Sequence, residues 1–129
     1  MLTKEQILQA DDLPTKVVPV PEWNGEVIVR TMSGEERDAW EQSITTKRGD
    51  DIQVNMANLR ARLCSQTIVD EDGELLFSKD DVDLLGQKSA KALDRIFGIA
   101  QKLNGLGKDD IKELAKNSDT GQSEDSTSS

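Results

Sequence analysis

The side chains that could do chemistry in this chain of 129 residues are carboxylates and one thiol, because the sequence contains no histidine. Histidine is the commonest general base and metal ligand, so its absence removes the usual nucleophilic triads and most metal sites. Two acidic clusters, Glu35-Glu36 and Asp80-Asp81-Asp83, remain as candidates for acid–base catalysis. Each begins a predicted helix, where carboxylates interact favourably with the helix dipole. We therefore assign both clusters a structural role and expect no catalytic residue and no enzyme activity.

Two short segments resemble ligand-binding loops but lack the residues that the ligands require. If Gly73 were the central glycine of a calcium loop, Ile68 would be the first ligand and Lys79 the last, and neither can bind calcium. The segment Gly105-Leu106-Gly107-Lys108 resembles the end of a phosphate-binding loop, but Asp109 follows it in place of Ser or Thr. We therefore interpret residues 70–73 as a hairpin turn, and we expect no metal and no cofactor.

Cys64 is the only cysteine, so no disulfide can form within the chain. It has no histidine to activate it and lies next to the apolar stripe of its predicted helix, which favours a buried, inert thiol. No apolar run approaches the roughly 18 residues of a membrane span. The N-terminal residues also lack the pattern of a signal peptide. We therefore expect a cytosolic protein.

The formal net charge of −9 argues against nonspecific binding to nucleic acid or to anionic membranes, since both require a basic surface. Two Trp, two Phe and no Tyr are the aromatic residues, so the core must be mostly aliphatic. A chain of this length buries about two thirds of its unfolded surface, which suffices for one hydrophobic core. The composition therefore predicts one soluble domain.

A compact series of local signals lies in the first third of the chain. The dipeptide Asn24-Gly25 predicts a two-residue type I′ turn, and the β-branched residues 26–32 predict a strand after it. Ser33 and Glu36 then match a capping box, which predicts a helix that extends to about Thr45. These elements form a turn, a strand and a helix without a linker.

The residues before this series predict a short helix and an edge strand. Thr3 and Gln6 match a second capping box, and we expect Ile7 of the helix that follows to pack on the body. Residues 16–20 are expected to pair with the β-branched strand. Because Pro19 cannot donate a hydrogen bond to a neighbouring strand, residues 16–20 should lie at the edge of the sheet.

The middle of the chain predicts a loop, a helix and a second hairpin. The polar residues 46–51 are expected to form the loop. The helix is predicted by apolar residues at helical spacing, which are Met56, Leu59 and Leu63. Its N-cap is expected to be Asp51 or Asn55. Residues 68–69 and 74–77 flank an Asp-Gly turn and predict the hairpin.

The last third predicts three helices and a polar tail. Ser78 is expected to cap a short helix, and residues 89–103 predict the strongest helix of the chain. Its apolar stripe is continuous: Leu93, Ile96, Phe97, Ala100 and Leu103. Gly98 interrupts this helix, which suggests a packing requirement or the close approach of a neighbour. A final short helix is expected to begin at Asp109 or Asp110.

Together these elements predict an α+β fold, with a small, mostly antiparallel sheet from two β-hairpins packed by about five or six helices. Residues 1–116 are expected to form a single globular domain. Residues 117–129 contain no aliphatic or aromatic side chain, so we expect a disordered acidic tail rich in Ser and Thr. The sequence leaves open whether the two hairpins share one sheet.

Four apolar residues are the candidates for partner binding. Trp23, beside the predicted turn, is either a clasp against the core or an interface anchor. Leu106 lies in the glycine-containing segment before the last predicted helix, whose apolar side is formed by Ile111 and Leu114. That helix could dock on its own domain or lie in a groove of a partner.

Two stretches of the sequence resemble the tail assembly chaperones of long-tailed, siphovirus-type bacteriophages. The first is residues 21–41, PEWNGEVIVRTMSGEERDAWE, and the second is residues 70–78, DEDGELLFS, followed by two helices and a soluble tail. The resemblance covers roughly residues 1–116 and carries no catalytic signature.

The resemblance implies a non-catalytic binding protein that keeps the tape measure protein soluble and helps recruit major tail protein during tail assembly. It also implies synthesis in the cytoplasm of the infected host, absence from the mature virion, and in many family members a longer product made by translational frameshifting. The implied partners are proteins, with no nucleic acid and no membrane. Self-association is left open.

Other readings of the residues are an acidic inhibitor that imitates DNA, a cytosolic regulatory adaptor, and an enzyme that uses carboxylates and a metal. A DNA mimic requires a regular stripe of carboxylates with few cations. Here basic residues interrupt the acids: Lys47, Arg48, Arg60, Arg62, Lys88, Lys91, Lys102 and Lys108. An adaptor would use the first hairpin or the last helix as its docking site.

Overall fold

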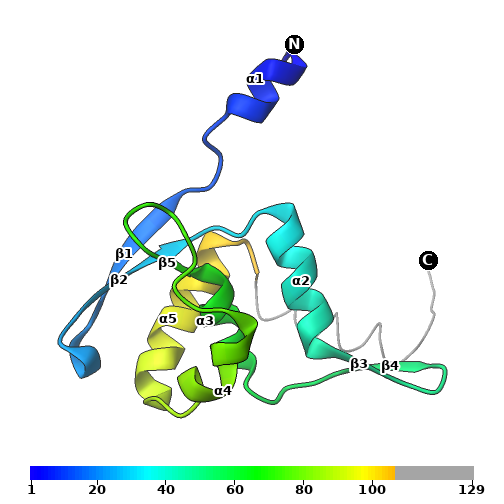
Figure 1. Cartoon of the computed structure of the whole chain (residues 1–129), viewed down its shortest axis with the longest axis vertical. Helices are drawn as coiled ribbons and strands as arrows, with labels where there is room; N and C mark the ends of the chain where they lie inside the picture. Colours follow the sequence, from blue (N-terminus) through cyan, green and yellow to red (C-terminus); the bar gives the residue numbers. More distant parts are fainter. Residues whose placement is uncertain (107–129) are drawn as a thin grey trace.

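The computed structural model describes residues 1–106, and within them only the backbone at 46–48, 52 and 54. The α-helices are α1 (Lys4–Gln9), α2 (Gly34–Ile44), α3 (Leu59–Thr67), α4 (Val82–Leu85) and α5 (Ala90–Leu103). The strands are β1 (Thr15–Val20), β2 (Gly25–Arg30), β3 (Thr45–Arg48), β4 (Asp51–Val54) and β5 (Ile68–Val69), with 3-10 turns η1 (Pro21–Trp23) and η2 (Lys79–Asp81). The predicted α+β class is confirmed (Figure 1).

Several predictions for the C-terminal residues lie outside the described residues. They include the final helix from Asp109 or Asp110, with Ile111 and Leu114, and the tail 117–129. The boundary between a domain at 1–116 and that tail lies outside the described part as well, so it remains a prediction.

The main sheet is antiparallel and has the strand order β1-β2-β5. Its first hairpin pairs Val18 with Val27, and β1 is the edge strand that Pro19 predicted. Strand β5 pairs with β2 through Ile28 and Val69, so the two predicted hairpins meet in one sheet. The far side of the second hairpin is reduced to a single bridge, between Val69 and Leu75.

The first hairpin turn is longer than the Asn24-Gly25 dipeptide predicted. Val20 pairs with Gly25, which leaves Pro21 to Asn24 as the loop. Pro21 begins the 3-10 turn η1, and Asn24 closes it in the left-handed conformation with φ 54°. The type I′ prediction is wrong because the fixed φ of a proline favours the first position of a helical turn. Gly25 is instead the first residue of β2.

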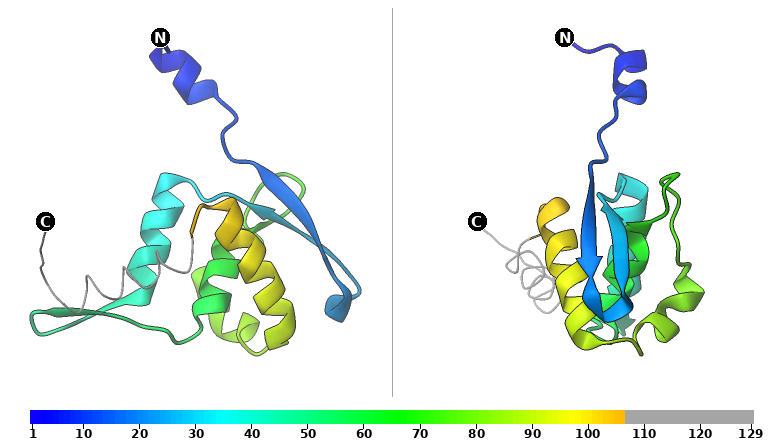
Figure 2. Two further views of the ribbon diagram at one scale, coloured as in Figure 1. Left: turned by 180° about the vertical axis from the view of Figure 1, so that it is seen from behind. Right: turned by 90° about the vertical axis from the view of Figure 1, so that its left-hand side faces the viewer.

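Helix α1 forms with its predicted capping box but lies away from the body (Figures 1 and 2). None of its residues is buried, and Ile7 is 56 % exposed, so the prediction that Ile7 packs on the body is wrong. Residues 10–14 connect α1 to β1 and contain two acids and a proline. Such a segment favours an extended, solvated backbone, which holds the helix off the body.

Residues 46–51 do not form the predicted loop. Strands β3 and β4 pair in antiparallel register across Gly49 and Asp50, and Gly49 has φ 62°. The prediction weighed the polar residues and overlooked the flanking β-branched ones, which favour strands on both sides of a glycine turn. The resulting two-stranded ribbon projects from the C-terminal end of α2 (Figure 1).

The helix boundaries follow local capping in most places. Ser33 and Glu36 make both hydrogen bonds of their capping box at α2, and Ser89 caps α5. Helix α3 is the exception, since its N-cap is Asn58, with φ 55°, rather than Asp51 or Asn55. The Asn55 side chain instead accepts a hydrogen bond from the amide of Ala57, which forms a turn ahead of the helix.

The core lies between the sheet and helices α2, α3 and α5. Helix α3 packs against both α5 and α2, and the sheet covers α5 (Figure 2). Trp40 of α2 is 1 % exposed and is surrounded by aliphatic side chains from every layer. The fully buried ones include Val18, Val20, Val29, Ile44, Leu63, Ile68 and Ile96. The prediction of a mostly aliphatic core is confirmed.

Gly98 of α5 has no packing requirement within the described part of the chain. A Cβ atom added there would have no other element's heavy atom within 4 Å among residues 1–106, so no described neighbour approaches it closely. We expect Gly98→Ala to raise the free energy of unfolding by about 0.5–1 kcal/mol, because alanine loses less backbone entropy in a helix. Urea denaturation measures the change.

The matched control for this substitution is Gly73→Ala. Gly73 has φ 85°, a conformation that alanine adopts only with strain, so the same side-chain addition should destabilise the protein. A loss of stability in Gly98→Ala would show that the position requires glycine.

Candidate partner-binding surfaces

The acidic clusters have structural roles in the fold. Glu36 accepts hydrogen bonds from the Ser33 amide and from Arg30, and Asp81 accepts one from the Ser78 amide. The helix-start role that the sequence predicted is confirmed for these two residues. Within residues 1–106, no group of three or more Cys, Asp or Glu side chains is arranged to hold a metal ion.

Cys64 is fully buried on α3, as predicted. Burial raises the pKa of its thiol to about 12, with a further contribution from the negative charge of Asp94. The thiol therefore stays protonated at neutral pH, and its sulfur lies 3.9 Å from the carbonyl oxygen of Leu93. A protonated, buried thiol is a poor nucleophile.

The acidic segment 70–73 is a hairpin turn, as interpreted from the sequence. The Asp70 carboxylate accepts hydrogen bonds from the amides of Asp72, at 2.8 Å, and Glu74, at 3.0 Å. The Asp70 amide donates to the Glu74 carbonyl, and Gly73 has a positive φ. The Asp70 carboxylate therefore makes its hydrogen bonds within the turn, which explains why an acid is favoured at position 70.

Trp23 lies at the tip of the first hairpin, half-buried against the core. Its neighbour Glu22 forms an ion pair with Arg95 of α5, with one N–H···O distance of 3.0 Å. The hydrogen bond from Arg95 lowers the pKa of Glu22 to about 2, and the same bond raises the pKa of Arg95. The pair therefore stays charged at mildly acidic pH and fastens the hairpin tip to α5.

We expect Trp23→Ala to lower the free energy of unfolding by about 1–2 kcal/mol, because only part of the indole leaves water on folding. Trp23→Phe should retain most of that stability. Chemical denaturation of the three proteins measures the differences. A loss as large as that of a fully buried tryptophan would assign Trp23 wholly to the core and leave no surface for a partner.

In the part of the chain that the structure describes, large apolar side chains are exposed in two places. The first is the N-terminal segment 1–14, named the arm below, where Leu2, Ile7 and Leu8 are all more than half exposed. The second is the body, where the exposed apolar residues come from several elements: Val17, Met56, Leu76 and Leu84. Scattered single exposures are ordinary, but in the arm two exposed apolar residues are adjacent on α1 and a third precedes the helix.

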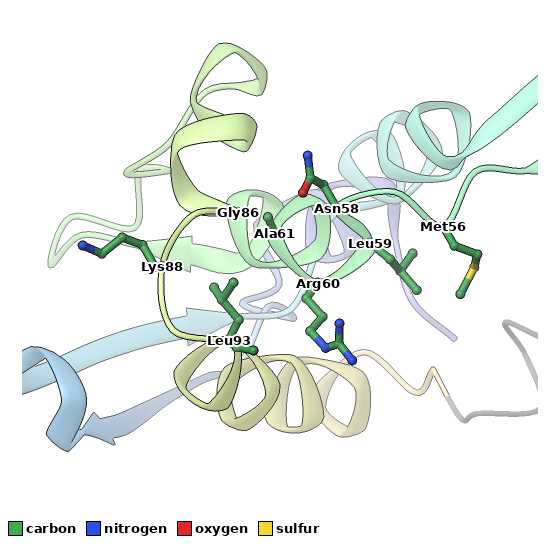
Figure 3. Close-up of a pocket in the computed structure, with 9 residues that line it drawn as sticks. Met56, Asn58, Leu59, Arg60, Ala61, Gly86, Lys88 and Leu93 are labelled. Carbon is green, nitrogen blue, oxygen red and sulfur yellow. The ribbon is translucent and has the colours of Figure 1, made fainter.

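A cavity of about 150 Å³ lies beside Met56 (Figure 3). It is formed by the start of α3, the end of α4 and the start of α5, and we name it the α3–α5 pocket. Leu59 and Leu93 supply apolar walls, while Arg60 and Lys88 are the two charged residues that line it.

Gly86 shapes one wall of the α3–α5 pocket. A Cβ atom at this position would lie 2.6 Å from Oδ1 of Asn58, so a larger residue would displace the Asn58 side chain at the α3 cap. The Asn58 side chain also donates a 3.1 Å hydrogen bond to Asp83. Two segments distant in sequence, residues 56–61 and 86–93, thus form the pocket, and Arg60 pairs with Asp94 on its α5 side.

A family model described as phage tail assembly chaperone matches residues 4–118, which is most of the chain. The chain belongs to the phage tail assembly chaperone family. The resemblance of residues 21–41 and 70–78 to this family is therefore confirmed. Comparison with curated proteins gave no match.

A solved structure, that of the bacteriophage HK97 tail assembly chaperone, shares the fold of this family member. The two align with a TM-score of 0.53 and 24 % sequence identity, over 77 % of this chain and 90 % of the HK97 chain. In the described residues, no helix is long and apolar enough to cross a membrane.

The described structure places two of the four residues predicted for partner binding. Trp23 keeps part of its surface exposed, whereas Leu106 is 4 % exposed and packs in the core. Leu106 ends a Schellman motif: its amide donates to the Gln101 carbonyl, and Gly105 has φ 67°. Sequence reasoning missed the α3–α5 pocket because its walls come from separate elements. It also placed Met56 in the apolar stripe of a helix, which is wrong, since Met56 precedes α3 and is 58 % exposed.

Proposed function

We propose that this chain keeps the tape measure protein soluble and helps recruit major tail protein during phage tail assembly. It acts by reversible binding without catalysis, in the cytoplasm of the infected host, and does not remain in the mature virion. Membership of the tail assembly chaperone family supports this proposal. The observation that carries it is the set of exposed apolar side chains on a strongly acidic chain.

The physical requirements of such a holder match this surface. A protein that binds exposed apolar segments of a partner must present apolar groups of its own. It must also stay soluble with that load, and a net charge of −9 provides the repulsion that prevents precipitation. Reversible holding needs no covalent chemistry, so a protonated Cys64 and carboxylates engaged in caps and turns are compatible with the role.

We propose that Trp23 contacts the partner through its exposed part, with the Glu22–Arg95 ion pair fixing the position of the tip. Ile111 and Leu114 are proposed as further contacts. Leu106 is buried, so we propose no direct partner contact for it. In this proposal it anchors the chain immediately before the segment that contains Ile111 and Leu114.

Co-expression with the tape measure protein tests the proposal. The tape measure protein is expected to stay soluble and to co-purify with the chain, and to precipitate without it. Replacing two exposed apolar residues, Met56→Asp and Leu84→Asp, should reduce co-purification, because each substitution removes apolar surface at a site that the fold does not need. The control is Gln87→Asp, which adds one negative charge at an exposed polar position.

Equal solubility of the tape measure protein with and without the chain would overturn the proposed role. Equal co-purification by the double variant and by the Gln87→Asp control would show that Met56 and Leu84 do not contribute to the holding surface. Pull-down of purified major tail protein tests the recruitment step separately.

A further inference from the structure

The main sheet has a second apolar surface, on the face opposite the core. Successive residues of a strand point to opposite faces of a sheet. Val18, Val20 and Val29 belong to the buried core and lie on the face that α5 covers (Figure 2). Val17 and Ile28 alternate with these residues along β1 and β2, and they pair with each other. They therefore lie on the other face, named the outer face below.

Four apolar residues form one row across the outer face. Val17 pairs with Ile28, Ile28 pairs with Val69, and Val69 forms the bridge to Leu75. Val69 is buried but is not part of the main core cluster. Val17 is 52 % exposed, and Ile28 and Leu75 are partly exposed. We name these four residues the outer row.

The outer row is not covered by a helix of the described chain. Among the helices within residues 1–106, only α5 packs extensively against β1 and β2, and it lies on the core face. Helix α1 lies away from the body (Figure 2). Four neighbouring positions at the usual strand spacing extend over about 14 Å, which is the length of about ten helical residues. The outer row is therefore an apolar strip that one partner helix can cover.

The charges around the outer row are mostly negative. Glu26 lies on the outer face, two residues along β2 from the row. The turn at 70–74, which precedes the last residue of the row, contains four acids and no base. Arg30 lies on the same face, but its charge is compensated by the ion pair with Glu36. Lys16 of β1 belongs to the opposite face. A partner segment with basic residues beside its apolar side is therefore electrostatically favoured.

We propose that the outer row binds an amphipathic helix of the protein that the chaperone holds, with lysine or arginine beside the apolar side of that helix. A helix fits because it satisfies its own backbone hydrogen bonds, whereas the face of a sheet offers a partner only side chains. The apolar side of the helix packs on Val17, Ile28 and Leu75, and its cations face Glu26 and the turn at 70–74. This inference rests on the proposed chaperone function and gives the held protein a binding surface and a chemistry.

A designed peptide tests this surface without any other phage protein. The probe is a fluorescein-labelled peptide of about 18 residues, because much shorter peptides rarely form helices in water. It carries leucine at helical spacing and lysine on both sides of the leucine stripe. In the control peptide, glutamate replaces every lysine. Fluorescence anisotropy with the purified chain should show binding of the lysine peptide that is tighter by about tenfold or more. Equal binding of the two peptides would overturn the proposal.

Substitution of Val17 locates the binding site. Val17→Asp should weaken binding of the lysine peptide about tenfold, because it places a charge in the apolar row. Val17→Thr keeps the β-branched shape that suits a strand and should also weaken binding, by a smaller factor. The matched control is Leu8→Asp, which makes the same change at a residue of the arm that is 73 % exposed. Equal losses in Val17→Asp and Leu8→Asp, with circular dichroism showing folded proteins, would contradict the assigned surface.

Charge reversal on the outer face gives a second test. Glu26→Lys should weaken binding of the lysine peptide and strengthen binding of the glutamate peptide, an exchange of preference that a change in stability alone does not produce. Glu5→Lys makes the same change of charge on α1 and should leave both affinities nearly unchanged. Equal effects of the two substitutions at physiological salt would show that the net charge of the chain, and not the outer row, attracts the peptide.

Two other occupants of the outer row are distinguished by the amide NMR signals of Val17, Ile28 and Leu75. A shift of these signals in Leu8→Asp without peptide would place the arm on the row. A shift when the unmodified chain alone is concentrated would place a second copy there, and either result would overturn the proposal. Co-expression with the tape measure protein remains a separate test: solubilisation that Val17→Asp does not reduce would leave the chaperone function intact and refute only this surface.

Discussion

Replacing Trp40 by alanine is expected to lower the free energy of unfolding by about 3–5 kcal/mol. Trp40 is the largest fully buried side chain in the described residues and contributes to the cluster that joins α2, α3, α5 and the sheet. Its removal leaves a cavity that the surrounding aliphatic side chains cannot fill. Small domains have a total stability of about 5–15 kcal/mol, so the variant should be partly unfolded at physiological temperature.

Thermal unfolding followed by circular dichroism measures the effect of Trp40→Ala. The matched control is Trp40→Phe, which keeps the ring and removes the indole N–H. That N–H is buried with no hydrogen-bond partner in the described part of the chain, so its loss carries no penalty of its own. The phenylalanine variant should therefore lose far less stability. Similar losses in both variants would contradict a role based on packing volume.

Replacing Arg30 by alanine is expected to cost about 2–3 kcal/mol of stability. The Arg30 guanidinium, at the end of β2, donates to both carboxylate oxygens of Glu36, at 2.8 and 2.7 Å, and to the Gly73 carbonyl at 2.7 Å. Both side chains of the ion pair are less than one fifth exposed. One residue thus joins the sheet, the start of α2 and the turn of the second hairpin.

A double-mutant cycle between Arg30→Ala and Glu36→Gln isolates the interaction of the pair. The comparison is Glu41→Gln, which removes the acid of the exposed pair that Arg37 and Glu41 form one helical turn apart. Exposed pairs of this kind contribute about 0.3–0.5 kcal/mol, so Glu41→Gln should have little effect. A coupling energy for Arg30 and Glu36 no larger than that would show that solvent screens their interaction.

Local features of the fold were predictable because neighbouring residues determine them. The capping boxes at Thr3 and Ser33 form as the sequence indicated, and Ser78 caps the turn η2. The glycine cap at Gly105 follows from the same kind of short-range hydrogen bonding. The burial of Cys64 was also predictable, since its position beside an apolar stripe required no knowledge of the partner helix.

Features that depend on contacts between distant segments were not predictable. The capping box of α1 predicts a helix but not whether any surface covers it, so Ile7 was wrongly placed on the body. The polar side chains of residues 46–51 led to the prediction of a loop, whereas the β-ribbon found there forms only when both of its strands pair. The proposal for Trp23 came from its residue type and turn context, whereas the α3–α5 pocket exists only after residues 56–61 and 86–93, which are distant in sequence, come together.

The arm and the end of α5 are both held by residues that directly follow β2. Thr31 holds Pro14 through its amide, and the amide of Met32 donates a 2.7 Å hydrogen bond to the side chain of Asn104. The arm and the residues that follow Leu106 therefore originate at one corner of the molecule. A partner bound at the base of the arm would therefore lie beside Asn104, at the end of α5.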